Sequence, residues 1–179
     1  MIRFTIIPTL AAMTLGATAA WAGPDDFTTG PLIEAYGAVA EIDSQMPIPD
    51  GTVFQVAFDI SSAAEVGELN RQLVSAARFL NMHAAAGIAP ENLQIAIVVH
   101  GGAVRDVSSD SHFTPGVEPA NADLVATLIA HGVRVYVCGQ SAAYHDVGAE
   151  DLLPGVTMAL SAMTAHALLQ QDGYTLNPF

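Results

Sequence analysis

Cysteine is almost absent from this chain: Cys138 is the only one among 179 residues. A single cysteine cannot close a disulfide within the chain, so the fold must rest on its hydrophobic core. The thiol is then either a small buried apolar side chain, one half of an intermolecular bond or a reactive group. The cysteine and the six histidines show no HxH, HxxxH or CxxC spacing, so the sequence predicts no metal site.

Phosphate-binding and hydrolase motifs are also missing. Gly101 and Gly102 do not belong to a G-x-G-x-x-G fingerprint, and no Walker loop is present. Ser141 lacks the G-x-S-x-G context of a hydrolase nucleophile. We therefore expect no nucleotide cofactor, and the sequence indicates no cofactor of another kind.

Positive charge is scarce. There is no lysine, and five arginines face 18 acidic residues, which gives a formal net charge of −13. Removal of the first segment with Arg3 would leave 4 − 18 = −14. A surface this acidic repels phosphate backbones and anionic lipid, so we expect neither nucleic-acid binding nor membrane-surface binding.

The first 22 residues have the pattern of an export signal. Arg3 supplies a positive start, an apolar stretch follows, and Ala20-Trp21-Ala22 fits the small-x-small cleavage pattern. We expect cleavage after Ala22 and export, to the periplasm. No membrane attachment is expected after cleavage, because no later segment is apolar enough to span a bilayer.

Beyond the signal, the sequence predicts an arm with little regular structure over residues 23–50 and one α/β domain over residues 51–179. Within the domain, strand patterns and helix patterns alternate. The predicted strands are residues 53–60, 93–100, 133–138, 155–159 and 174–176. The predicted helices are residues 63–86, 121–131, a short one from about 141, and 161–171, with a long loop from 101 to 116. This order predicts a three-layer α/β/α sandwich with a mostly parallel sheet of about five strands.

The ends of the predicted strands hold the candidates for a functional site. Parallel strands end at one edge of a sheet, so Asp59, His100 and Cys138 are expected along a common rim. The backbone N–H groups after Cys138 and the positive end of the next helix favour the thiolate, the nucleophilic form. We therefore expect an accessible, reactive thiol, with an inert buried cysteine as the alternative.

Other candidates surround this rim. His100 is a candidate proton donor and acceptor, or else a histidine satisfied by a loop carbonyl. Gly101 and Gly102 let a ligand approach the backbone closely. Arg105 is a candidate anion anchor, or else a partner for one of the many acidic side chains. The remaining candidate binding residues flank the thiol: Tyr136, Gly139, Gln140 and Ser141.

Several of these segments resemble the DsrE/DsrF-like family. The resemblance rests on the runs Gly132–Ala142 and Val98–Val104, on Leu153-Pro154-Gly155-Val156, and on the closing segment Leu168–Tyr174. It covers the chain from about Thr52 to the C-terminus. The resemblance implies a small α/β sandwich that assembles into homo-oligomers. It also implies that the matching cysteine, Cys138, accepts sulfane sulfur as a persulfide and hands it on.

These observations give one main hypothesis and two alternatives. In the main hypothesis, an exported protein uses Cys138 as a sulfur acceptor or thiol relay and exchanges sulfur with a donor or acceptor protein. Enzymatic turnover is not required, because a carrier holds its cargo until a partner takes it. The alternatives are a small-molecule or metal binding module whose cysteine only lines a pocket, and a structural subunit of a larger assembly.

Overall fold

The structure is a computed structural model, and it describes residues 23–109, 113 and 118–178. The predicted signal, residues 1–22, lies outside the described residues. Within the described part of the chain, none of the helices has the length and apolar character needed to cross a membrane.

Five parallel strands form one sheet, in the spatial order β4-β3-β2-β1-β5. The central strand β2 is buried at every position except Gln94, as its nearly continuous apolar run predicts. The strands are β1 (Phe54–Ile60), β2 (Leu93–Val99), β3 (Arg134–Cys138), β4 (Thr157–Ala159) and β5 (Thr175–Asn177).

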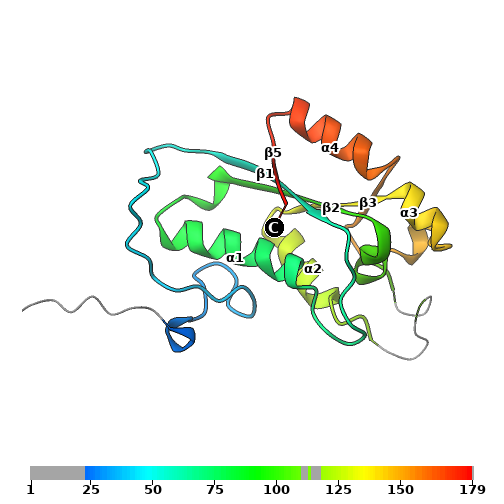
Figure 1. Cartoon of the computed structure of the whole chain (residues 1–179), viewed down its shortest axis with the longest axis horizontal. Helices are drawn as coiled ribbons and strands as arrows, with labels where there is room; N and C mark the ends of the chain where they lie inside the picture. The colour runs from blue at the N-terminus through cyan, green and yellow to red at the C-terminus, as the bar shows by residue number, and fades with distance from the viewer. Residues whose placement is uncertain (1–22, 110–112, 114–117, 179) are drawn as a thin grey trace, which may run out of the picture.

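Helices cover both faces of the sheet. The α-helices are α1 (Arg71–Ala85), α2 (Ala122–Ala130), α3 (Gly139–Tyr144) and α4 (Ala162–Gln171). Short 3-10 helices occur at Pro24–Asp26, Pro90–Asn92, Gly101–Val107 and Ala149–Asp151. Helices α1 and α2 lie on one side of the sheet and α4 lies on the other (Figure 1). The predicted α/β sandwich is therefore confirmed.

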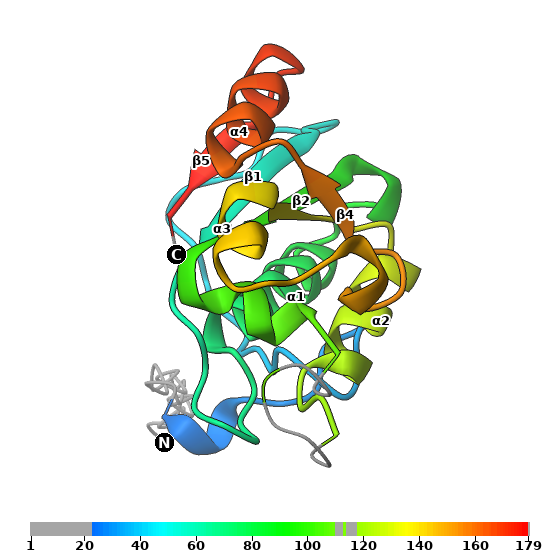
Figure 2. The ribbon, with the colours of Figure 1, turned by 90° about the vertical axis from the view of Figure 1, so that its right-hand side faces the viewer.

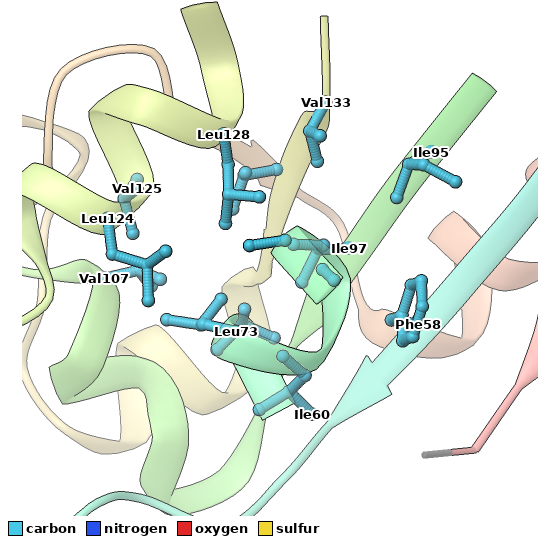
Figure 3. Packing of buried hydrophobic residues seen from close by; sticks show 14 of the residues in the cluster. Phe58, Ile60, Leu73, Ile95, Ile97, Val107, Leu124, Val125, Leu128 and Val133 are labelled. Carbon is cyan, nitrogen blue, oxygen red and sulfur yellow. The ribbon is translucent and has the colours of Figure 1, made fainter. Parts of the chain in front are cut away.

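Two hydrophobic clusters separate the layers. The larger one fills the space between the sheet and helices α1 and α2, where strand residues such as Phe58 and Ile97 meet Leu73 and Leu128 (Figure 3). The smaller one lies between the sheet and α4. Its buried members are Ala57, Ala96, Val98, Ala165, Leu169 and Tyr174.

Strand alternation decides which side chains share the α4 face. Val135 and Val137 of β3 belong to the larger cluster, so Tyr136 and Cys138 project to the opposite face. Phe58 and Ile60 of β1 likewise place Asp59 on the α4 face. The polar groups at the strand ends therefore lie on the same face as the smaller cluster.

Helix α1 begins later than its apolar pattern predicts. The pattern predicts a helix from residue 63, but the structure begins it at Arg71. Asn70 caps it, because its side-chain oxygen accepts a hydrogen bond from the Gln72 N–H at 2.9 Å. Gly67, with φ of +84°, interrupts any helix before that point.

The stretch after β2 is also more regular than predicted. Residues 101–107 form a 3-10 helix in place of the start of a long loop. Ala103, Val104 and Val107 are fully buried in the larger cluster, and this packing stabilises the turn. The sequence does not indicate this helix, because two consecutive glycines, Gly101 and Gly102, usually mark the end of regular secondary structure.

Asn81 is one of the side chains that fasten the segment 23–50 to the domain. Asn81 of α1 is fully buried, and its Oδ1 accepts hydrogen bonds from the backbone N–H groups of Leu32 and Ile33 at 3.2 and 2.8 Å. Its Nδ2 donates to three backbone carbonyls, those of Ile33, Tyr36 and Gly37. A side chain on Gly30 would collide with Asn81, since a Cβ there would lie 1.9 Å from its Cγ.

Candidate functional site

Cys138 lies where two helices begin. It is the last residue of β3 and precedes the first residue of α3. On the neighbouring strand it pairs with Ala159, after which the chain turns into α4 (Figure 2). The start of α3 approaches the end of β4 closely at Gly139, where a Cβ would lie 2.7 Å from the carbonyl oxygen of Ala159. Glycine is required there by this close approach.

Hydrogen-bond donors from both helices point at the sulfur. Burial alone raises the pKa of the Cys138 thiol, but the donors outweigh it and the pKa is lowered below its usual value. The strongest is the Ser141 hydroxyl, followed by the backbone N–H groups of Ser141, Ala162 and Gln140. Ala162 is the first residue of α4, so the positive end of that helix also faces the thiolate.

Ser141 connects the thiol to the end of β2. The Gly101 N–H donates a hydrogen bond to the Ser141 oxygen at 3.0 Å. Because this bond uses a lone pair of that oxygen, the hydroxyl proton is free to be donated to the sulfur. Gly101 and Ser141, both predicted binding residues, are thereby placed next to each other and next to the thiol.

The exposure of the thiol differs from the sequence-based expectation. The sequence predicts an accessible sulfur, whereas Cys138 is 6% exposed. The physical reason is the start of α4, which crosses the end of β3 and places the Ala162 N–H on the sulfur. The thiol thus lies just beneath the rim and not on its surface.

A second polar cluster lies on the same face. Asp59 of β1 accepts from two histidines: His166 Nε2 lies 2.7 Å from its Oδ1, and His100 Nε2 lies 3.2 Å from both carboxylate oxygens. His100 immediately follows β2, and His166 comes from α4. The prediction that Asp59 and His100 share a rim is thus met by direct contact between them.

Asp59 is ionised near neutral pH. Burial raises the pKa of its carboxyl group, but hydrogen bonds from His166 and His100, and the positive charge that these rings can hold, lower it further than burial raises it. An ionised carboxylate only accepts hydrogen bonds, so the Nε2 atom of each histidine carries the proton. Each ring therefore has its Nδ1 atom available for another partner.

The Asp59 cluster and the thiol are neighbours. Val99 of β2 pairs with Val137 of β3, so His100 stands at the next position, level with Cys138 on the adjacent strand. His100 is extended, with φ of −150°, and continues the strand direction. Adjacent strands are about 4.8 Å apart. On α4, His166 follows Ala162 by one turn, about 6 Å along the axis.

The importance of His166 was not predicted from the sequence. It forms its contact with Asp59 across 107 positions of the chain. A signal was present in the helical periodicity, because Ala162, Ala165 and Leu169 form an apolar stripe and His166 falls within it. A histidine on the inward face of a helix needs a polar partner, and Asp59 is that partner.

Other predicted residues lie around or away from the thiol. The predicted roles of Arg105, an anion anchor or a partner for an acidic side chain, stay predictions: its Nη2 donates to the Ala64 carbonyl, and it lines a pocket with Glu65, Glu68 and Asp106. Tyr136 is partly buried against the smaller cluster. A surface pocket of about 430 Å³ lies beside the thiol, and its lining residues are Gly101, Gly102, Gln140, Ser141, Tyr144 and His145. Over the described ranges, no three His, Cys, Asp or Glu side chains are grouped so as to hold a metal ion.

Comparisons with known proteins agree with this fold. The model of the DsrE/DsrF-like family matches residues 55–178. Among solved structures, a protein of unknown function from Methanobacterium thermoautotrophicum, MTH1491, is similar at 21% identity and a TM-score of 0.55, over 70% of this chain and 99% of that one. The ychN protein of E. coli is similar at 15% identity and a TM-score of 0.48, over 71% of this chain and 100% of that one. None of the curated proteins is similar enough to match.

Proposed function

Because the chain belongs to the DsrE/DsrF-like family, which is associated with sulfur relay, we propose that Cys138 accepts a sulfane sulfur as a persulfide and passes it on. The observation that supports this most is the set of donors around the sulfur. A hydroxyl and three backbone N–H groups stabilise the thiolate, and they come from the starts of two different helices. A cysteine that only filled space would need none of them.

The loading step is a thiolate attack on a hydropersulfide, R–S–SH. The Cys138 proton passes to His100, and the thiolate attacks the outer sulfur of the donor. One S–S bond forms to Cys138 while the S–S bond of the donor breaks. The leaving thiolate R–S⁻ takes the electron pair of the broken bond and recovers the proton from His100, so no external oxidant or reductant is needed.

Discharge runs through the same groups. An acceptor thiolate attacks the outer sulfur of the Cys138 persulfide, and Cys138 leaves as a thiolate. A thiol with a lowered pKa is a better leaving group, so the donors that favour loading also favour discharge. Because Cys138 is only 6% exposed, the donor can reach the sulfur only after an outward motion of the turn that joins β4 to α4.

The proposal includes the cellular location and the oligomeric state of the protein. The first 22 residues support export to the periplasm, where a donor or acceptor protein would meet the carrier. Exposed apolar side chains on and before α4, Leu160 at 73% and Met163 at 80%, support assembly into a homo-oligomer. The native mass of the purified protein tests assembly, and the N-terminal residue of the exported protein tests cleavage after Ala22.

The test of the chemistry is an intact-mass measurement. Reduced protein is incubated with cysteine hydropersulfide, and we expect a gain of one sulfur atom per chain, located on Cys138. The variant Cys138→Ser should gain none. A native protein that carries a free thiol but gains no sulfur from any hydropersulfide contradicts the proposal.

A further inference from the structure

Asp59 is shared by two histidines whose surroundings differ. The His100 side chain is 31% exposed, and the His166 side chain is 15% exposed beneath α4. Both use Nε2–H to donate to the carboxylate, so each could bind a further proton only at Nδ1. The free energy of placing a proton on Nδ1 depends on the groups that surround that atom.

Only one of the two rings is suited to gain a proton. Among the buried side-chain nitrogen and oxygen atoms of the described residues, His166 Nδ1 is the one that has no hydrogen-bond partner. A proton there would create a buried N–H without an acceptor, which is strongly disfavoured. A proton on the more exposed His100 ring can be hydrated, and it faces the same carboxylate charge.

Few other charged groups face this cluster. From β3 come Cys138 itself and Tyr136, while Arg134 at the far end of that strand stacks its guanidinium 4.8 Å from the Tyr174 ring. On α4, Asp172 follows the C-terminal end of the helix. The three residues of β5 have no ionisable side chain. Asp59 is thus the charged group nearest to either imidazole among the described residues.

We propose that the two histidines have separate roles in the thiol chemistry of Cys138: His166 stays neutral and positions Asp59, and Asp59 fixes His100 as the group that exchanges a proton with the thiol. This rests on the function proposed for Cys138. The proton moves from the sulfur to His100 Nδ1, and the resulting imidazolium is paired with the carboxylate. The net charge of the three groups is unchanged by the transfer.

The same contact also fixes the helix over the thiol. His166 and Ala162 are one turn apart on α4, and the Ala162 N–H donates to the sulfur. The bond from His166 to Asp59 therefore ties this turn of α4 to β1. Loss of that bond affects the thiol in two ways. It changes the orientation of His100, and it changes the position of the Ala162 N–H relative to the sulfur.

Two variants of His166 separate the donor from the shape of the side chain. His166→Gln keeps an N–H at a position similar to Nε2, whereas His166→Leu keeps the bulk and removes the donor. The readout is the pH dependence of the alkylation rate of Cys138 by iodoacetamide in the native protein. His131→Leu, on the exposed end of α2, is the matched control for loss of a histidine.

We expect His166→Leu to slow alkylation at neutral pH roughly tenfold, the effect of raising the thiol pKa by about one unit. His166→Gln and His131→Leu should stay close to the original protein. Asp59→Asn should reproduce the loss, which provides a second variant if His166→Leu does not fold. If His166→Leu or Asp59→Asn keeps the original pH profile, or if the Gln and Leu variants are slowed equally, the positioning role is overturned.

Nitrogen NMR of the imidazole rings gives an independent test without a variant. We expect both rings to carry their proton on Nε2, and we expect the Nδ1 resonance of His166 to be that of a nitrogen without a hydrogen-bond partner. A proton on Nδ1 of His166 overturns the assignment. If one of these tests fails but Cys138 still gains sulfur, only the separate roles of the two histidines are wrong. If the original protein gains no sulfur, the proposed carrier function is wrong as well.

Discussion

Replacement of Ser141 by alanine is expected to make the Cys138 thiol less acidic. The Ser141 hydroxyl is the strongest single contributor that lowers the pKa of this thiol, and the Gly101 N–H holds its oxygen at 3.0 Å. A hydrogen bond to a charged group contributes about 1.5 to 3 kcal/mol. Since about 1.4 kcal/mol corresponds to one pKa unit, and sulfur is a weak acceptor, we expect the pKa to rise by about one unit.

The assay is the rate of Cys138 alkylation by iodoacetamide as a function of pH. The midpoint of the rate profile should move to higher pH in Ser141→Ala, while the plateau rate at high pH stays the same. Ser75→Ala is the matched control, because the Ser75 hydroxyl donates to a backbone carbonyl on the exposed side of α1. An unchanged midpoint in Ser141→Ala would show that this hydroxyl does not stabilise the thiolate.

Three further variants test the close packing beside the thiol, the attachment of residues 32–37 and the burial of His83. Gly139→Ala should lower the free energy of unfolding by roughly 2 kcal/mol, because its Cβ meets the Ala159 carbonyl oxygen at 2.7 Å; urea unfolding measures this, and no loss contradicts the close approach. Asn81→Ala should cost roughly 4 kcal/mol and speed amide exchange over residues 32–37, since their backbone groups lose buried partners; unchanged exchange counts against the fastening role. Burial lowers the pKa of His83, despite its hydrogen bond to the Phe79 carbonyl, so its neutral form is favoured in the folded protein. Stability should therefore fall as pH drops below about 6.5, and His83→Leu should remove that part of the decline in urea unfolding at several pH values.

Much of this arrangement was predictable because it depends on local patterns. The apolar run that ends at Cys138 predicts a strand, and alternation predicts that Tyr136 and Cys138 share a face. The rule that parallel strands end together places Asp59 and His100 on one rim, and the structure brings them into contact. These inferences need only the period of a strand and the order of the elements.

The remaining features depend on contacts between distant segments. The start of α4 covers the thiol because β4 pairs with β3, and no local pattern shows that Ala162 lies over Cys138. The start of α1 is likewise set at a distance: the Asn121 side chain accepts a hydrogen bond from the Asn70 N–H at 2.8 Å. A polar side chain can have several possible hydrogen-bond partners, and the one that it uses is known only once the whole fold is known.

The central physical claim is that the Cys138 thiol has a lowered pKa and can be reached by small reagents at the edge of the folded domain. Mass-spectrometric measurement of iodoacetamide labelling of the native protein, without denaturant and below the pH at which an ordinary thiol titrates, tests it most directly. We predict complete labelling of Cys138, at a rate that falls only at more acidic pH. Labelling that requires denaturant would contradict the claim, because the sulfur would then be an inert part of the interior.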